Sequence, residues 1–262
     1  MKVLYEACPL CESKNFTFLK SANALQHALY SPPLPDTIRW MRCESCEHVF
    51  TDGYWTPAAL DILFQKTHEV QDVKRANQEM LRVVNARIVQ SLVSYPLPKD
   101  PISLLDVGFG SGSLLFTAEE FGLEVSGIDL RKQNVADACE MGLDATEVSI
   151  EEFSKLHPDH FSVVTLADVL EHVPYPKTML KAANDLLKQG GLLFLSCPNM
   201  DTIIWRALDM TSQNPYWFEL EHHHNFTRKR LYSLLEETGF EVLRYGVSER
   251  YRTCMEIIAR VN

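Results

Sequence analysis

An aspartate and three glycines alternate within the segment LLDVGFGSGSLL, which spans residues 104–115. Asp106 ends an apolar run, and Gly108, Gly110 and Gly112 follow at every second position. Glycine lets the main chain approach a ligand closely, because no Cβ stands in the way. A loop of this kind that leads into a helix also presents free main-chain N–H groups. The spacing predicts a small-molecule site in which bare main chain lies beside a carboxylate.

The glycine loop does not match the nicotinamide dinucleotide fingerprint G-x-G-x-x-G. The third glycine would fall on Ser113 if the motif began at Gly108, and on Leu115 if it began at Gly110. A carboxylate at the mouth of the loop also suits a cationic ligand better than a pyrophosphate. A nicotinamide oxidoreductase is therefore an alternative that the sequence disfavours.

Two CxxC pairs, Cys8/Cys11 and Cys43/Cys46, precede the glycine loop. The two sulfurs of each pair can converge on one tetrahedral ion, so the pairs together supply a complete set of four ligands. We expect a structural Zn²⁺ at these cysteines, with iron as the alternative metal and free thiols as the alternative without a metal. His48 is a spare ligand next to the second pair.

Acidic and histidine side chains in two later segments are candidates for acid–base chemistry. His172 lies in VLEHV, directly after an apolar run, while Glu221 and His222 lie in ELEHHHNFT at 219–227. Histidine titrates near neutral pH, so it can accept a proton from a substrate. Adjacent residues point in different directions, so three neighbouring histidines rarely bind one ion together. We predict that His172, Glu221 and His222 are catalytic, with packing or hydrogen bonding as the alternative role for at least one histidine.

Strands and helices alternate along the middle of the chain. Apolar runs predict strands at 102–107, 161–168 and 192–198. A further strand is predicted at 123–130 and a weaker one at 143–149. Helical spacing predicts helices at 113–121, 133–142 and 176–191, the last with Gly190 and Gly191 just beyond its end as a stop signal. Such alternation indicates a parallel sheet with helices on both faces. The predicted fold class is α/β, with a doubly wound Rossmann-like sheet.

The flanking segments predict additional parts around this sheet. Residues 228–240 form an amphipathic helix, and two strand-like runs after it predict a C-terminal antiparallel hairpin. Residues 1–55 are expected to form a small zinc-ribbon-like domain, and residues 56–98 a helical linker or lid. The main domain is then 99–262, with an acceptor-side segment at about 200–230.

The order of motifs in the main domain resembles class I S-adenosylmethionine-dependent methyltransferases. The D-x-G-x-G-x-G loop, Asp129 at the end of the second strand, VLEHV and LLKQGG carry this resemblance, which covers about residues 100–200 in detail. It implies that Asp106 interacts with the amino group of the methionyl moiety, directly or through water, and that Asp129 accepts both ribose hydroxyls. Ile150 or Glu151 would lie near the adenine. The same resemblance gives Leu130 and Ala167, at two strand ends, to the cofactor site together with the three glycines.

The cysteine pairs and the α/β unit together resemble methyltransferases with an N-terminal zinc-binding domain. Several of those enzymes act on nucleotide sugars or other biosynthetic intermediates. Glu221 and His222 match an acid–histidine pair of sugar and quinone methyltransferases, while Glu219 stands where sugar C-methyltransferases have a tyrosine. The resemblance implies methyl transfer from S-adenosylmethionine to an oxygen or carbon of a small sugar- or quinone-like molecule. The alternative is a zinc-dependent protein- or RNA-binding module on a degenerate methyltransferase scaffold.

The composition of the 262 residues narrows the expected partners. A hydrophobic fraction of 46% is typical of a globular protein with a core, and a formal net charge of −10 disfavours nucleic acid as a partner. No apolar stretch approaches about 18 residues, and the N-terminus lacks the pattern of a signal peptide. We therefore expect no membrane partner and a cytoplasmic location, while the oligomeric state stays open. Cys139, Cys197 and Cys254 are expected to be small core residues.

Overall fold

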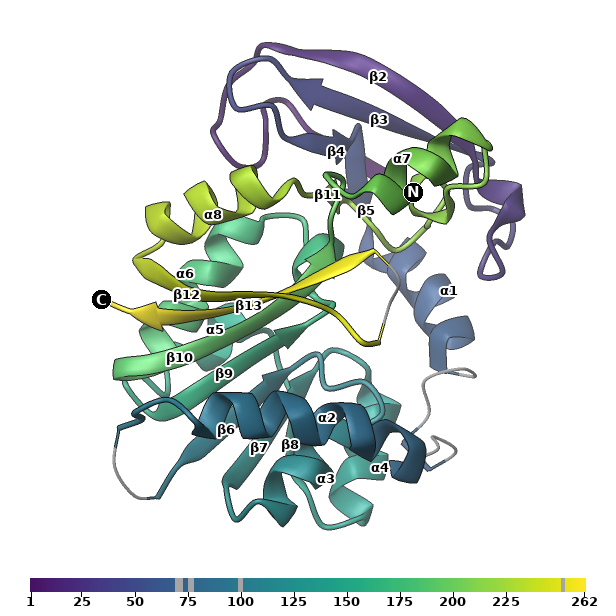
Figure 1. Ribbon diagram of the computed structural model, residues 1–262. Helices are drawn as coiled ribbons and strands as arrows, with labels where there is room; N and C mark the ends of the chain where they lie inside the picture. Colours follow the sequence, from purple (N-terminus) through teal and green to yellow (C-terminus); the bar gives the residue numbers. More distant parts are fainter. Residues whose placement is uncertain (69–72, 75–77, 99–100, 251–252) are drawn as a thin grey trace.

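A computed structural model of the chain describes residues 1–68, 73–74, 78–98, 101–250 and 253–262. Figure 1 shows a large twisted sheet with helices packed on it, and a smaller N-terminal sheet that lies against one end of this assembly. Among the described residues, none of the helices combines the length and the apolar character that crossing a membrane requires.

The large sheet carries the α/β fold. Its strands are β6 (Ser103–Val107), β7 (Glu124–Asp129), β8 (Asp144–Glu147), β9 (Phe161–Ala167), β10 (Leu187–Pro198), β12 (Phe240–Val247) and β13 (Cys254–Val261). Their order in the sheet is β12-β13-β10-β9-β6-β7-β8. The strands from β10 to β8 are parallel, whereas β13 is antiparallel to both β10 and β12. The predicted doubly wound sheet with a C-terminal antiparallel hairpin is confirmed.

Helices cover both faces of this sheet, as Figure 1 shows. One face packs against α2 (Gln78–Val93), α3 (Ser113–Glu120) and α4 (Lys132–Glu140). The other face packs against α5 (Ile150–Phe153), α6 (Pro176–Leu186) and α8 (Arg228–Glu237). The other helical elements are α1 (Pro57–His68), α7 (Ile203–Met210), η1 (Ala24–Gln26), η2 (Leu170–His172) and η3 (Pro215–Trp217).

The two-sided cover explains the continuous apolar pattern of β6. All of its residues are buried, because successive side chains point to opposite faces and each face carries a helix layer. Leu105 and Val107 pack with α6 and α8, while Leu104 packs with α2 and α3. The chain leaves β6 toward β7 on one side and returns to β9 on the other. Ligands of doubly wound folds bind at the carboxyl ends of strands at such a switch point.

The predicted helix at 176–191 is wrong in its last part. α6 ends at Leu186, and Leu187 already has extended main-chain angles and begins β10. The pairing of β10 with β9 is interrupted by a bulge between Leu187 and Leu192. Gly190, with a φ of 75°, lies within that bulge rather than at the end of a helix. The glycines that suggested a helix stop therefore serve a bend in a strand.

The N-terminal residues form two further sheets. β1 (Lys2–Leu4) pairs with β5 (Gly53–Trp55), and a four-stranded sheet contains β2 (Phe16–Asn23), β3 (Thr37–Cys43), β4 (Val49–Thr51) and β11 (His224–Asn225). The last of these strands, β11, comes from the predicted acceptor-side segment and pairs antiparallel with β4. Tyr5, Leu10 and Phe50 also belong to the same core cluster as Leu231 and Leu234 of α8. The N-terminal sheet is thus joined to the main domain by strand pairing and by a shared core.

The three unpaired cysteines differ in burial. Cys197 and Cys254 are buried, as expected, whereas Cys139 is exposed. The core prediction is wrong for Cys139 because this residue lies on the outward side of α4, where its Sγ donates to the carbonyl of Ala145 at 3.4 Å.

Candidate active site and four-cysteine centre

A cavity of about 440 Å³ lies at the carboxyl ends of β6, β7 and β9. A volume of this size is typical of small-molecule and cofactor sites. The strand ends contribute Val107, Gly108, Ile128, Asp129 and Asp168 to its wall. Further wall residues come from α1 (Leu60, Leu63, Phe64), from 148–151 (Val148, Ser149, Ile150, Glu151) and from the loop after β9 (Val169, His172, Val173, Pro174, Tyr175). Glu221 of the acceptor-side segment also lines the cavity.

The glycine loop follows β6 in left-handed conformations. Gly108, Gly110 and Gly112 have φ values of 65°, 57° and 71°, which side chains with a Cβ rarely adopt. Gly108 lines the cavity, and a Cβ at this position would lie 3.0 Å from Val169 Cγ2. The main-chain N–H of Gly110 donates to Asp129 at 3.2 Å, and Gly112 is the N-cap of α3. The loop therefore exposes main chain without a Cβ to the cavity at Gly108, and α3 begins directly after the loop.

Asp106 and Asp129 lie on adjacent parallel strands. Asp106 pairs opposite Gly127 of β7, two residues before Asp129. Asp106 is buried and accepts a hydrogen bond of 2.6 Å from Thr165 Oγ1. Asp129 faces the cavity, and its carboxylate accepts 2.8 Å and 3.0 Å contacts from the side chain of Arg131. The two carboxylates thus lie at one edge of the sheet, one behind the cavity wall and one in it.

Lowering the pH from about 8 to about 6 is expected to weaken binding of S-adenosylhomocysteine about tenfold. Burial raises the pKa of Asp106 to about 7, so its carboxyl group takes up a proton over this interval. Only the ionised carboxylate of Asp106 attracts the ammonium group in the amino-acid part of S-adenosylhomocysteine. Binding therefore releases a proton, and the affinity falls as the pH falls. Calorimetry at both pH values measures the change, and Asp106→Asn is the control that should remove it. A pH-independent affinity of the unaltered protein would contradict this role of Asp106.

The remaining predicted cofactor residues lie around the same cavity. Leu130, Ile150 and Glu151 line it, and Ser149 caps α5 so that Ile150 and Glu151 begin that helix. Among the described residues, Asp106, Gly110, Gly112 and Ala167 are not part of the wall itself. Ala167 lies directly before Asp168, which does line the cavity. Contact of these residues with a cofactor stays a prediction.

One ring nitrogen of His172 forms a hydrogen bond to the main chain. It lies in η2, immediately after β9, and its Nδ1 lies 3.0 Å from the main-chain carbonyl oxygen of Glu221. A carbonyl only accepts hydrogen bonds, so Nδ1 of the neutral ring carries the proton and Nε2 keeps its lone pair. This tautomer is the one that a general base requires. His172 is also one of the residues that line the cavity.

Two buried groups next to His172 have atoms without hydrogen-bond partners within the described part of the chain. These atoms are Oε2 of Glu171 and Nδ1 of His222. Burial, together with nearby Asp168, raises the pKa of Glu171 well above its ordinary value, and burial lowers the pKa of His222 to about 3. Ligand atoms of Glu171, His172 and His222 lie within 4.8 Å of one another, so this carboxylate and these two imidazoles are close enough to share one metal ion.

An N-terminal histidine that sequence patterns did not single out reaches the acceptor-side segment. His27 follows directly after η1, and its Nε2 lies 2.7 Å from Glu219 Oε1. Burial opposes ionisation of Glu219, but the bond from His27 and the proximity of His222 lower the pKa of Glu219 to about 2. His27 has no spacing relation to Glu219 in the sequence, so only the folded chain brings them together.

The adjacent histidines 222–224 point to different neighbours, as expected. His222 forms an edge-to-face contact with His172, with ring centroids 4.7 Å apart. His223 Nδ1 lies 3.4 Å from Thr51 Oγ1, and His224 Nδ1 lies 3.0 Å from His48 Nε2. The predicted acid–histidine pair is therefore split, because Glu221 lines the cavity while His222 packs behind it against His172.

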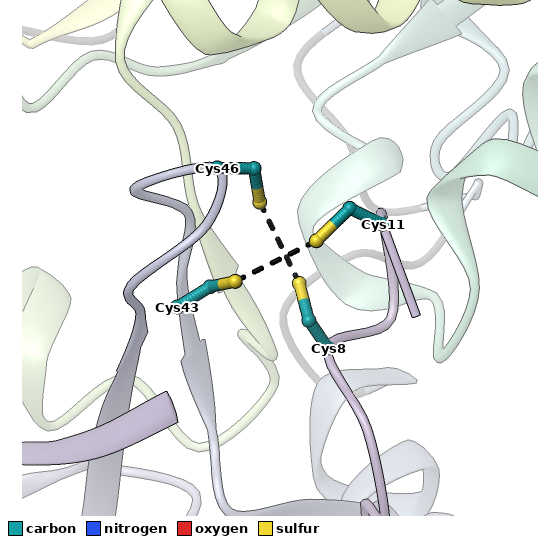
Figure 2. A group of neighbouring side chains, drawn as sticks. All are labelled: Cys8, Cys11, Cys43 and Cys46. Carbon is teal, nitrogen blue, oxygen red and sulfur yellow. Dashed lines mark hydrogen bonds between the residues drawn. The ribbon is translucent and has the colours of Figure 1, made fainter. Parts of the chain in front are cut away.

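Figure 2 shows the four cysteines of the two CxxC pairs converging on one point. Cys8 Sγ lies 3.7 Å from Cys46 Sγ, and Cys11 Sγ lies 3.5 Å from Cys43 Sγ. Sulfurs about 2.3 Å from a tetrahedral Zn²⁺ are about 3.8 Å apart, so the thiolate set fits this ion. All four ligand positions would be filled by protein, which is the arrangement of a structural site.

Three residues next to the cysteines have features that the CxxC spacing does not predict. Glu12 and Glu47, which follow the two CxxC pairs, have φ values of 60° and 59°. Both adopt the left-handed conformation that glycine favours at this position of metal-binding turns. Because glutamate has a Cβ, this conformation is strained. His48, the spare ligand, lies outside the four-sulfur group and bonds His224 instead.

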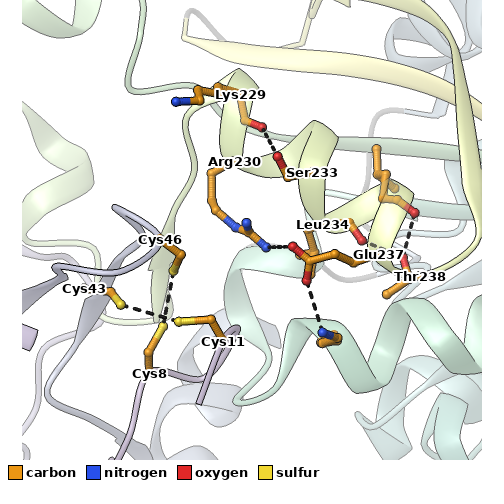
Figure 3. A network of polar contacts seen from close by, with 12 residues as sticks. Cys8, Cys11, Cys43, Cys46, Lys229, Arg230, Ser233, Leu234, Glu237 and Thr238 are labelled. Carbon is orange, nitrogen blue, oxygen red and sulfur yellow. Dashed lines mark hydrogen bonds and ion pairs between the residues drawn. The ribbon is translucent and has the colours of Figure 1, made fainter. Parts of the chain in front are cut away.

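Figure 3 shows the cysteine group beside α8. Cys8 and Cys43 belong to the core cluster that contains Leu231 and Leu234 of this helix. Arg230 of α8 donates to Glu237 at 2.7 Å, and Glu237 also pairs with Lys177 of α6 at 3.1 Å. The four-cysteine centre is thus packed on the main domain and is not an outlying module.

The comparisons with known proteins agree with this geometry. A family model described as Methyltransferase domain matches residues 76–245. The match covers more than half of the chain, so the chain belongs to this methyltransferase family. The predicted resemblance to methyltransferases is confirmed.

Curated relatives match only part of the chain. The ubiquinone biosynthesis O-methyltransferase of Idiomarina loihiensis is 39% identical over 108 residues, which are 39% of this chain and 44% of that protein. The enzyme of the same name from Yersinia pestis is 35% identical over 108 residues, which are 39% of this chain and 45% of that protein. The matched segment therefore spans less than half the length of these relatives.

Solved structures show the fold. A 1,6-didemethyltoxoflavin-N1-methyltransferase from Burkholderia thailandensis, with bound S-adenosylhomocysteine, superposes with a TM-score of 0.58 at 16% identity, covering 84% of this chain and 97% of that one. A SAM-dependent methyltransferase from Methanosarcina mazei superposes with a TM-score of 0.52 at 22% identity, covering 66% of this chain and 96% of that one. The chain has the fold of SAM-dependent methyltransferases.

Proposed function

We propose that this protein transfers a methyl group from S-adenosylmethionine to a hydroxyl oxygen of a small, quinone-like molecule. The observation that carries the proposal is a single cavity lined both by Gly108 and Asp129 and by His172. Methyltransferase-family membership supports the reaction class. The names of the curated relatives support oxygen as the methylated atom and a quinone-like acceptor.

The residues of the cavity fit the cofactor by their chemistry. Asp129 offers a carboxylate to a ribose diol, Gly108 offers main chain without a Cβ, and Val148 and Ile150 offer apolar surface beside Glu151 to an adenine. Bound there, S-adenosylmethionine supplies an electrophilic methyl group on a cationic sulfur. The acidic character of the wall favours such a cation electrostatically.

His172 supplies the general base in this proposal. Its Nε2 accepts the proton of the acceptor hydroxyl, and the oxygen then forms a bond to the methyl carbon as the sulfur–methyl bond breaks. The hydrogen bond from Nδ1–H to the Glu221 carbonyl keeps the ring in the required tautomer. Orientation of the acceptor opposite the sulfur supplies a large part of the rate acceleration.

His172→Ala is expected to lower methyl transfer by about 10²–10⁴-fold while leaving S-adenosylhomocysteine affinity within about twofold. Transfer is measured with radiolabelled S-adenosylmethionine and a panel of quinols, simple phenols and sugars, in which the quinols should be the best acceptors. His157→Ala provides a matched control, since His157 stacks on Phe153 on α5 and should leave transfer unchanged. Full activity of His172→Ala would remove the base from the proposal, and methylation of sugar carbons would overturn the acceptor class.

Calorimetric titration with S-adenosylhomocysteine separates this proposal from the binding-module alternative. If the proposal holds, the protein should bind S-adenosylhomocysteine in the micromolar range or tighter. Absence of binding at high protein concentration would favour the alternative of a zinc-dependent protein- or RNA-binding module on a degenerate scaffold.

A further inference from the structure

The acceptor-side strand β11 is held between the N-terminal sheet and the main domain. Thr51 N–H of the N-terminal sheet donates to the His223 carbonyl at 2.9 Å. On the other side, His223 N–H donates to the Glu171 carbonyl at 2.8 Å. His224 pairs opposite Phe50 of β4. The position of the neighbouring His222 therefore depends on where β4 lies.

The second cysteine pair forms the turn that leads into β4. β3 ends at Cys43, and β4 begins at Val49. Within the turn, Glu47 N–H donates to the Cys43 carbonyl at 3.0 Å, and Cys43 N–H donates to the His48 carbonyl at 2.9 Å. An ion held by Cys43 and Cys46 would fix this turn, and with it the start of the strand to which β11 pairs.

Side-chain hydrogen bonds of His48 and His224 form a second connection between the same two parts of the chain, here called the bridge. His48 and His224 are both fully buried, their rings stack with centroids 5.2 Å apart, and His48 Nε2 lies 3.0 Å from His224 Nδ1. His224 Nε2 lies 2.8 Å from the Val173 carbonyl oxygen. Since that carbonyl only accepts, His224 donates from Nε2 and accepts at Nδ1, so His48 donates from Nε2. The bridge ends at Val173, the residue directly after His172.

We propose that His48 and His224 are positioning residues, through which the four-cysteine centre fixes His172 and His222 on the acceptor side of the cavity. His48 stands two residues after Cys46, and His224 two residues after His222. The bridge therefore joins a metal-ligand turn to both candidate catalytic histidines. The assignment of an acceptor role to these histidines rests on the proposed function, whereas the mechanical coupling does not.

Two substitutions at position 48 separate hydrogen bonding from packing. His48→Phe keeps an aromatic ring that can stack between Phe50 and Phe226 but removes the donor. His48→Gln keeps an N–H donor at a similar distance from the main chain. Hydrogen exchange is measured by mass spectrometry on the full, zinc-loaded chain in segments 169–174 and 219–227, with 104–115 as the internal reference.

His48→Phe is expected to raise exchange in 169–174 and 219–227 about fivefold to tenfold and to leave 104–115 unchanged. His48→Gln should stay within about twofold of the unaltered protein. Bound zinc, measured by elemental mass spectrometry, should remain at one ion per chain in both variants. Removing the ion from the unaltered protein with a chelator should loosen the same two segments before the reference segment.

Three results would overturn the coupling. One is unchanged exchange at 219–227 in zinc-loaded His48→Phe. Another is equal loosening of all three segments in both variants, which would make His48 a packing residue of the whole fold. The third is full protection of 219–227 after chelation. Titration of the unaltered protein with S-adenosylhomocysteine tests the proposed function separately, because the coupling is measured by hydrogen exchange and does not depend on cofactor binding.

Discussion

Asp129→Ala is expected to weaken binding of S-adenosylhomocysteine by about 100-fold or more. The carboxylate lies at the end of β7 and lines the cavity, where it is proposed to accept both ribose hydroxyls. Hydrogen bonds to a charged group contribute about 1.5–3 kcal/mol each, so losing two of them costs about 3 kcal/mol or more. Isothermal titration calorimetry at fixed pH and ionic strength measures the loss.

Two further variants make this result specific. Asp144→Ala removes an exposed carboxylate from the neighbouring strand β8, where it accepts a bond from Ser126, and should leave affinity unchanged. Arg131→Ala removes the guanidinium that pairs with Asp129 at 2.8 Å. The ribose hydroxyls then do not have to displace this guanidinium from the carboxylate when the cofactor binds. Its affinity should equal or exceed that of the unaltered protein. If Asp129→Ala bound within twofold of the unaltered protein, the cofactor site would have to lie elsewhere.

The large sheet could be predicted from sequence because its signals are local. β6, β9 and the second half of β10 are apolar runs that are buried on both faces. β7 and β8 are more polar and more exposed, and their alternation with helices is what indicates strands there. The glycine loop was equally readable, since left-handed positions such as Gly108 require glycine. The boundary after Leu186 was misread because Gly190 and Gly191 serve a strand bulge as well as they would a helix end. The helix predicted at 228–240 also ends earlier, at Glu237, and Phe240 already begins β12.

The acceptor side could be predicted only in part because its contacts are long-range. His172 and Glu221 were found from local motifs, but the 3.0 Å bond between His172 Nδ1 and the Glu221 carbonyl joins two distant segments. Glu171 stands in the same motif as His172, but the sequence gives no sign that its carboxyl group is buried. Nor does it show that Oε2 of Glu171 has no hydrogen-bond partner among the described residues. His27 and His48 reach the acceptor-side segment from the N-terminal sheet, through pairings with no sequence period.

The four-cysteine centre lies between these two cases. The CxxC spacing predicts four converging sulfurs, and the structure brings them together. What the spacing does not contain is the contact with α8, which follows from burial of Cys8 and Cys43 against Leu231 and Leu234. A metal site of this kind stabilises both the N-terminal sheet and its contact with α8. Loss of the metal should therefore destabilise more than the two CxxC turns.

Cys43→Ser is expected to abolish metal binding and to lower the melting temperature by about 10 °C or more. Cys43 is fully buried at the end of β3, so the change removes one of four ligands and leaves a hydroxyl inside the core. The free energy of metal binding at such sites is also free energy of folding, and an unpartnered buried hydroxyl adds about 1–3 kcal/mol to the loss. Elemental mass spectrometry and thermal unfolding of the purified chain measure the two effects.

Cys139→Ser is the matched control for this prediction. It makes the same chemical change at an exposed position on α4, so metal content and melting temperature should both remain unchanged. Elemental analysis of the unaltered protein also decides between zinc and iron, since tetrahedral thiolate sites accept either. If the unaltered chain, purified without chelators, contained no metal and melted at the same temperature as Cys43→Ser, the cysteines would be free thiols. The interface between the N-terminal sheet and α8 would then be stable without a metal ion.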